Sequence, residues 1–270
     1  MAHLLEDVYG GESIGRAARR VRKRGQHIYH HLKSIDEDAD FVESSIASLR
    51  SVYGSGVPAL GNRRNGTWYS GKFSGSVYFK STDGHHGCWN FALTRLNIHL
   101  AIAAIDKGAA IVVDSSVSKR FPDALTKTVP IWCAVLSGAV ARVQSRQRNE
   151  ELNWSEPFLP LWIMPSERDQ IKERIGTWIS ALMEAHEKFG ILDEIAERMT
   201  KPLRAMWYDR TSALLKEGRD GEAVGHGEDS LSFEQARHFA AGSLPFSPIL
   251  CLSASRARDP HSSRRGYHYI

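Results

Sequence analysis

The chain has 270 residues with a net charge of +4; 42% are hydrophobic and 24% charged, as in globular proteins with a buried core. No apolar run approaches the roughly 18 residues of a membrane span, and the start MAHLLEDVYGG lacks a signal-peptide centre. We therefore expect a protein of the cytosol or nucleus with no membrane partner. Cys88, Cys133 and Cys251 form no C-x-x-C pair, which predicts reduced, largely buried thiols rather than a zinc site or disulfides.

Residues 1–50 are predicted to form a basic helical segment. Its cations lie close together in the chain: Arg16, Arg19, Arg20, Arg22, Lys23 and Arg24. Such a cluster attracts polyanions such as nucleic acid, and the alternative is a solvated helix face. A second helix is expected in SIDEDADFVESSIASLR, with Ser34 or Asp36 as its cap and an apolar stripe that includes Phe41 and Leu49.

Residues 51–270 are predicted to form an α/β domain. GTWYSGKFSGSVYFK (residues 66–80) suggests a β-hairpin whose second strand leads directly into the next loop. The leucine spacing from Leu93 onward predicts a helix that Gly108 ends. The continuous apolar run AAIVV (residues 109–113) is typical of a strand covered on both faces.

The remaining residues add further helices and a third strand. A helix is expected over residues 130–144, and Ser166 and Asp169 resemble a capping box at the start of another. The charged, glycine-rich residues 217–229 predict a flexible insertion, and ILCL (residues 249–252) is a buried strand. This alternation predicts a layered α/β fold with a mainly parallel sheet, flanking helices and the N-terminal helical segment.

Three loops should meet at the carboxyl edge of this sheet, where ligands bind in open α/β folds. The first loop, STDGHHG, offers Asp83 and His85 as general bases. Metal ligation by the adjacent histidines and a simple Asx-type turn are the alternatives. The loop also has hydroxyls that can donate to phosphate oxygens and glycines that allow a ligand to approach closely. The residues predicted to contact the substrate are Lys80, Ser81, Thr82, Gly84 and His86.

The second loop, DSSVSKRFPDALTKT, starts with Asp114, which is placed to act in catalysis or to orient a metal ion. Hydroxyls and cations follow, just before a helix with Pro130 in its first turn, and a helix N-terminus binds anions. A phosphate site is predicted, without a P-loop motif; the alternative is a turn capped by Asp114 with solvated cations. The candidate ligands are Ser115, Ser116, Lys119, Arg120, Asp123, Lys127 and Thr128.

The third loop, SASRARDPHSSRR, is basic and follows the last predicted strand. Its first residues are expected to contact the substrate, and the later arginines suit phosphate or nucleic acid, with plain solvation as the alternative. The candidates are Ser253, Ser255 and Arg256 for the substrate, and Arg258, Arg264 and Arg265 for nucleic acid.

GSVYFKSTDGHHGCWNF, RLNIHL, IVVDSSVSKRFPDALTKTVPIWC and ILCLSAS closely resemble the initiator-tRNA 2′-O-ribosyl phosphate transferases of fungi and plants, and the similarity covers most of the chain from about residue 41. The resemblance implies transfer of a 5-phosphoribosyl group from phosphoribosyl pyrophosphate to the 2′-hydroxyl of adenosine 64 in initiator tRNA, which blocks its use in elongation. Family members carry arginine in place of Val117 and Ser118. They also continue into a phosphatase-like C-terminal domain, so we expect the given sequence to be the N-terminal catalytic portion.

The resemblance also implies roles for the loop residues. The cations of the second loop would hold the phosphates, Asp114 would orient Mg²⁺ or stabilise the ribosyl cation, and Asp83 or His85 would accept the hydroxyl proton. The roles of the two acids are interchangeable. Basic residues would contact tRNA phosphates, and no obligate protein partner is indicated. The rival interpretations are a tRNA-binding module that is inactive without the missing domain, and a phosphate-ester hydrolase.

Overall fold

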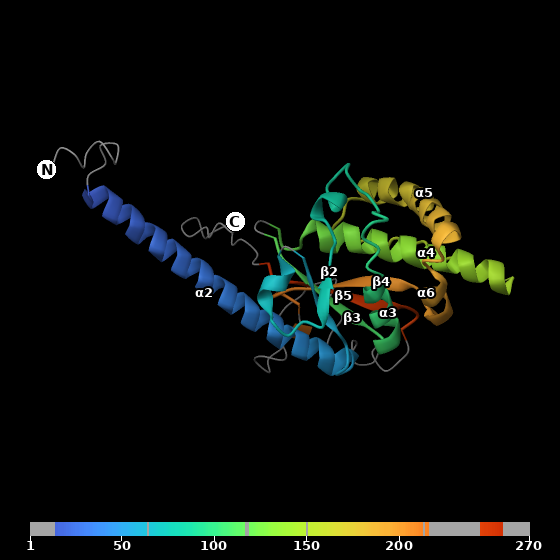
Figure 1. Ribbon diagram of the computed structural model, residues 1–270, viewed down its shortest axis with the longest axis horizontal. Coiled ribbons are helices and arrows are strands. Elements are labelled where there is room, and N and C mark those ends of the chain that lie inside the picture. The colour runs from blue at the N-terminus through green and yellow to red at the C-terminus, as the bar shows by residue number, and fades with distance from the viewer. Residues whose placement is uncertain are drawn as a thin grey trace.

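The computed structural model describes residues 14–63, 65–116, 119–149, 151–212, 214–215 and 244–255. Its centre is a sheet of five parallel strands in the order β2-β1-β3-β5-β4 (Figure 1). Helices cover both faces, so the predicted layered α/β fold is confirmed. The strands are β1 (Ala59–Asn62), β2 (Gly75–Val77), β3 (Ala110–Asp114), β4 (Leu203–Tyr208) and β5 (Ser247–Ser253).

The central strand β3 forms because its sequence AIVVD suits burial on every side. Parallel neighbours flank it on both edges, and all of its residues are buried. Alternate side chains enter opposite cores: Ala110 and Val112 face one layer of helices, and Ile111 and Val113 face the other. The predicted strand at this position is therefore confirmed.

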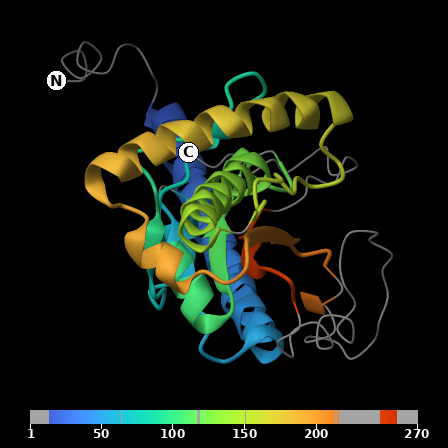
Figure 2. The ribbon, with the colours of Figure 1, turned by 90° about the vertical axis from the view of Figure 1, so that its right-hand side faces the viewer.

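Four helices lie on one face of the sheet: α3 (Ile98–Lys107), α4 (Val129–Arg148), α5 (Pro165–Phe189) and α6 (Asp193–Arg198). Helix α4 lies between the sheet and α5, which crosses on its outer side (Figure 2), and α4 is therefore apolar around most of its circumference. The stretch Ala124–Arg148 has the length and composition to cross a membrane, but its most apolar window is 100% buried within the protein, as in the core helix of a globular fold.

A single long helix, α2 (Ile14–Tyr53), covers the other face. Its second half packs side chains such as Phe41 and Leu49 against the sheet, whereas its first half extends well beyond the sheet (Figure 1). The prediction of two helices is wrong, because the helical spacing continues through Ser34 and Asp36 without a break. Ser34 is buried inside the helix rather than placed at its start.

The predicted hairpin over residues 66–80 is wrong. Gly66–Tyr69 form a short 3-10 helix, η1, and β2 pairs in parallel with β1, a strand that the sequence reading missed. Helix η1 crosses closely over the end of β3: a Cβ atom on Gly66 would lie 1.9 Å from the carbonyl oxygen of Val113. Only glycine allows this approach. Strand β4 was also not predicted.

The helix ends follow simple backbone rules. Gly108 ends α3 in the left-handed conformation with φ of 78°, as predicted. The capping box of Ser166 and Asp169 is wrong, because Met164 is the N-cap residue without a side-chain cap and Pro165 occupies the first turn.

Some predictions lie outside the described residues, namely the insertion at residues 217–229 and the basic third loop from residue 256 onward. The division of the chain at residue 50 stays a prediction. All cysteines are free; Cys133 and Cys251 are buried, and Cys88 is exposed.

Replacing Gly66 by alanine should lower the free energy of unfolding by about 1–3 kcal/mol or more, since the added methyl group overlaps backbone atoms of β3. Gly71→Ala is the matched control, because a Cβ atom there has nothing within 4 Å. Urea unfolding measures both values. An unchanged stability of Gly66→Ala, or an equal loss in the control, would contradict this close crossing.

Candidate active site at the carboxyl edge of the sheet

The order of the strands places a topological switch point between the ends of β1 and β3. These strands are neighbours, but the chain leaves β1 toward β2 on one side and leaves β3 toward β5 and β4 on the other. Such a switch point is where open α/β sheets bind ligands. Asn62 ends β1 and Asp114 ends β3, so these side chains lie side by side at the switch point.

Asp114 is held by two hydrogen bonds. The amide Nδ2 of Asn62 donates to Oδ2 at 2.8 Å, and the Ser115 N–H donates to Oδ1 at 2.8 Å. The side chain is almost fully buried. Burial raises the pKa of Asp114 to about 7, although both hydrogen bonds act in the opposite direction. A carboxyl group that titrates near neutral pH is suited to proton transfer.

The serines after β3 and β5 come together around Asp114, as predicted. The hydroxyl of Ser255 accepts a hydrogen bond from the Ser116 N–H at 2.8 Å, and Ser253 donates its hydroxyl to the carbonyl of Arg120 at 2.7 Å. Tyr69 of η1 donates to the Ser115 hydroxyl at 2.8 Å. These bonds fix the backbone of the second loop beside the switch point.

The first loop packs directly on the second. Residues Ser81–Gly84 form a 3-10 helix, η2, against a π-helix, η3 (Ala124–Thr128). A Cβ atom on Gly84 would lie 2.6 Å from the carbonyl oxygen of Asp123, and the Thr128 hydroxyl donates to the Lys80 carbonyl at 3.3 Å. The structure thus brings together these two loops, the signature loops STDGHHG and DSSVSKRFPDALTKT.

An ion-pair cluster of Asp123, Lys127 and Glu167 lies beside η2. The buried Nζ atom of Lys127 lies 3.4 Å from Asp123 Oδ1 and 3.0 Å from Glu167 Oε1. Trp89 also donates its ring N–H to Glu167 at 3.1 Å. The sequence reading missed Glu167, which comes from the first turn of α5. Its only sequence signal was an acid at a helix start.

The ion-pair cluster has exposed basic residues at its rim. His85 Nε2 lies 3.5 Å from Asp123 Oδ2, and His86 Nδ1 lies 3.6 Å from Glu167 Oε1. Lys119 also forms an ion pair with Asp123. These side chains, with the exposed Thr82 and the half-buried Ser81, surround a charged surface suited to an anionic ligand.

Asp83 and Arg120 each form an ion pair with a residue that the sequence did not suggest. Arg95 Nη2 donates to Asp83 Oδ2 at 2.5 Å, so this buried carboxylate is engaged in an ion pair. Arg120 pairs with Asp209, which follows β4. Burial would raise the pKa of Asp209, but hydrogen bonds from Arg120 and Thr211 outweigh it and hold that pKa below its ordinary value.

The prediction of a free helix N-terminus just before Pro130, which would bind an anion, is wrong. The helical backbone begins earlier, at Ala124, so Lys127 and Thr128 lie inside the π-helix rather than ahead of a free N-terminus. The Thr126 N–H already donates to the Pro122 carbonyl at 3.2 Å. An anion here would therefore meet side chains rather than the predicted N–H groups.

The described residues do not form a protein-held Mg²⁺ site around Asp114. No group of three or more His, Cys, Asp or Glu side chains suited to a metal occurs in the described part of the chain. Both oxygens of Asp114 already accept hydrogen bonds. The predicted metal role of Asp114 stays a prediction.

The basic residues predicted to contact tRNA are only partly described. Arg19 and Arg20 are exposed on the first half of α2, and the side chains of Arg22, Lys23 and Arg24 lie outside the described set. Arg256, Arg258, Arg264 and Arg265 lie beyond the described residues, as do Val117 and Ser118.

The chain has relatives among known proteins. Residues 21–270 match the family model described as the Rit1 N-terminal domain. The chain is 32% identical to the tRNA A64-2′-O-ribosylphosphate transferase of Saccharomyces cerevisiae over 264 residues, which cover 96% of this chain and 48% of that protein. It is 34% identical to an uncharacterized protein of Schizosaccharomyces pombe over 260 residues, or 94% and 49% of the two chains. The chain spans about half the length of these relatives, and no solved structure matches it.

Asp114 should make stability depend on pH. Its folded pKa of about 7 exceeds the value of 3.8 expected without the fold, so the folded state retains the proton between about pH 4 and pH 7. Stability should therefore fall as pH rises through this window, by up to about 1.4 kcal/mol per pH unit from this group. Urea unfolding of wild type and Asp114→Asn at several pH values isolates the contribution. Parallel pH dependences in the two proteins would contradict the raised pKa.

Proposed function

This chain belongs to the family of the Rit1 N-terminal domain, and from that premise we propose that it transfers a 5-phosphoribosyl group from phosphoribosyl pyrophosphate to the 2′-hydroxyl of adenosine 64 in initiator tRNA. The observation that carries the proposal is the 32% identity to a tRNA A64-2′-O-ribosylphosphate transferase across 96% of the chain. The buried acid at the switch point, with the basic residues of the neighbouring loops, supports it chemically.

The proposed reaction joins the acceptor 2′-oxygen to the anomeric carbon of the donor. The bond from that carbon to pyrophosphate breaks, and the hydroxyl loses its proton. Asp114 accepts this proton in our proposal, because a pKa of about 7 makes it a base that is both populated and effective near neutral pH. Before the proton arrives, the carboxylate also offsets positive charge at the anomeric carbon.

The leaving pyrophosphate gains negative charge as it departs. Lys119 and Arg120 lie on the loop that starts at Asp114; each pairs with one carboxylate, Asp123 or Asp209, but stays exposed, unlike Lys127. The first-loop histidines line the neighbouring rim. Fixed cations and donors at this place lower the energy of the transition state. Lys127 is buried between two carboxylates, so its proposed role is to position Asp123 and η3 rather than to release its charge to the ligand.

Asp83 has a positioning role in this proposal. Its ion pair with Arg95 keeps the carboxylate bound, and Arg95 also lies over the ring of Tyr78 at 5.4 Å. The pair joins the 3-10 helix η2 to the segment that precedes α3. His85, which is exposed at the rim, remains the second candidate for the base.

The acceptor lies in an A-form duplex, whose 2′-hydroxyls face a shallow groove and which proteins recognise by shape and phosphate contacts. The first half of α2 carries exposed arginines and extends away from the sheet (Figure 1), so it is positioned to reach a large RNA. Binding of initiator tRNA, a cytosolic or nuclear location and the absence of an obligate protein partner remain proposals. The half-length match to the relatives favours one alternative, a tRNA-binding module that needs further chain for catalysis.

The transfer assay tests the function. The protein is incubated with Mg²⁺, initiator tRNA and donor labelled in its ribose, and label should appear in the tRNA. An initiator tRNA with a 2′-deoxyadenosine at position 64 is the control and should take up none. Salt-dependent tRNA binding without label would instead support the binding module, and release of phosphate without transfer would support a hydrolase.

The basic first half of α2, called the basic arm, has its own test. Replacing Arg19, Arg20 and Arg22 by alanine should weaken tRNA binding and reduce its salt dependence by about 0.7–0.9 in log–log slope for each lost phosphate contact. The charge-matched control replaces Arg146, Lys188 and Arg198, which lie on the last turns of α4, α5 and α6. Equal effects of the two triple variants would show a general charge effect and contradict the arm as a contact.

A further inference from the structure

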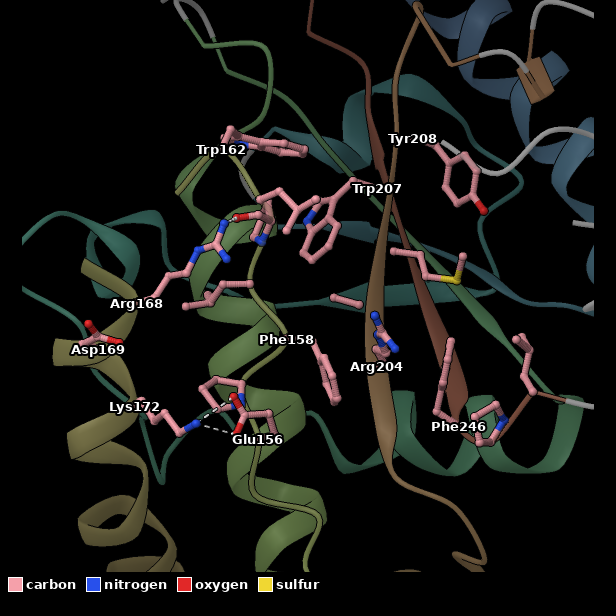
Figure 3. Close-up of a pocket in the computed structure, with 18 residues that line it drawn as sticks. Glu156, Phe158, Trp162, Arg168, Asp169, Lys172, Arg204, Trp207, Tyr208 and Phe246 are labelled. Carbon is pink, nitrogen blue, oxygen red and sulfur yellow. Dashed lines mark hydrogen bonds and ion pairs between the residues drawn. The ribbon is translucent and has the colours of Figure 1, made fainter. Parts of the chain in front are cut away.

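A cleft of about 710 Å³ lies beside the edge strand β4, and neither Asn62 nor Asp114 lines it. Residues 156–162, the first turns of α5, β4 and residues 244–246 form its walls. Figure 3 shows Trp162 and Trp207 near the carboxyl end of β4, and Phe158, Arg204 and Phe246 nearer its amino end. Nothing in the mechanism above uses these residues.

Two tryptophans give the upper part of the cleft fixed aromatic surfaces. Trp162 stacks on Phe121 with ring centroids 5.4 Å apart, yet 44% of Trp162 remains exposed. Trp207 meets Trp162 edge to face at 5.9 Å and donates its ring N–H to the Leu125 carbonyl at 2.9 Å. Because Phe121 and Leu125 belong to the second signature loop, this end of the cleft adjoins the candidate active site.

Arg204 places a cation in the cleft without a carboxylate partner among the described residues. Its guanidinium lies over the rings of Phe158 at 4.1 Å and Phe246 at 4.9 Å, and it has no hydrogen bond or ion pair within the described part of the chain. Burial lowers the pKa of Arg204, which means that the charge is incompletely solvated. An anionic group entering the cleft would compensate it. The lysine of the cleft, Lys172, already pairs with Glu156.

The free edge of β4 adds backbone hydrogen-bonding groups. Among the described residues β4 pairs only with β5, and the Ser247 N–H donates to the Pro202 carbonyl, so the register turns the backbone of Ala205 and Trp207 away from β5. Both residues line the cleft. Their N–H and C=O groups are therefore available to a planar ligand that has donors and acceptors along one edge.

We propose that this cleft binds one unstacked nucleotide of the RNA acceptor, with its base on the tryptophan surfaces and its phosphate at Arg204. The inference rests on the proposed function for the identity of the RNA. Stacking on aromatic rings, edge hydrogen bonds and one phosphate charge are the properties that a nucleotide combines. Residues 204 and 207 are roughly 10 Å apart along the strand, and their side chains leave opposite faces of the sheet, Trp207 on the side of Ala205 and Arg204 on the side of Met206. A base with its neighbouring phosphate can bridge this span by passing around the edge of β4.

A peptide that adds a strand to β4 is the competing occupant. Such a peptide would use the free edge of β4. Its backbone carries no negative charge that could pair with Arg204, and strand addition does not require exposed tryptophan rings. The charge and the aromatic surfaces together favour RNA, and the peptide becomes one outcome of the test.

The test uses Trp162→Ala and Arg204→Met, with Phe189→Ala as control because Phe189 is an exposed aromatic residue at the far end of α5. Each cleft variant should raise the KM for tRNA about ten-fold, the range expected for loss of one stacked base or charge contact. The kcat and the thermal unfolding should change little in both variants, and the donor affinity measured by calorimetry should change little in Arg204→Met. Donor affinity is not used to judge Trp162→Ala, because the Arg120 guanidinium lies over the Trp162 ring at 6.0 Å. A five-adenosine RNA should quench tryptophan fluorescence of the wild type and of Phe189→Ala, and should quench Trp162→Ala less.

The outcomes separate the two proposals. Wild-type transfer together with unchanged KM values in both cleft variants would overturn the nucleotide cleft and leave the function intact. Without wild-type transfer the function fails, and oligonucleotide quenching alone then decides the cleft. Quenching by an acidic, phosphate-free peptide but not by the RNA would overturn the proposal in favour of a peptide partner.

Discussion

The side-chain amide of Asn62 holds the carboxyl edge of the sheet together. It accepts a hydrogen bond from the Phe79 N–H at 2.8 Å, and its Nδ2 donates both to the Phe79 carbonyl at 2.9 Å and to Asp114 at 2.8 Å. One buried side chain thus links the end of β1, the segment after β2 and the end of β3. Because the side-chain carbonyl and one N–H of Asn62 both bond to the backbone of Phe79, the other N–H, which faces Asp114, has a fixed orientation. Asn62 therefore helps to place the first loop and the Asp114 carboxyl group relative to each other.

Charge around this edge is arranged in pairs. Burying a cation is tolerated when carboxylates and hydrogen bonds surround it, as they do for Lys127 between Asp123 and Glu167. Asp114 differs because its hydrogen-bond donors are neutral and it forms no ion pair among the described residues, so burial dominates and raises its pKa to about 7. The paired acids fix the loops, and in the proposed reaction Asp114 takes up the proton.

The sequence predicted the parts that depend on local pattern. The central strand, the parallel sheet and the meeting of the signature loops follow from an apolar run and from the rule for parallel strand ends. The strand ALGN was missed because its glycine serves close packing rather than a turn, as the contact of Gly61 with Thr67 shows. Glu167 and Asp209 were missed because long-range pairing brings them to the site. Such partners have no signal in sequence spacing.

The pH dependence of the transfer rate tests most directly whether Asp114 is the base at the reacting centre. Single-turnover transfer with saturating donor and tRNA should rise with pH and level off above about pH 7, because the carboxylate must be free to accept the proton. Asp114→Asn should remove this rise and slow the plateau about 100-fold or more. A rise of the same shape in Asp114→Asn, or a pH-independent wild-type rate, would contradict the account.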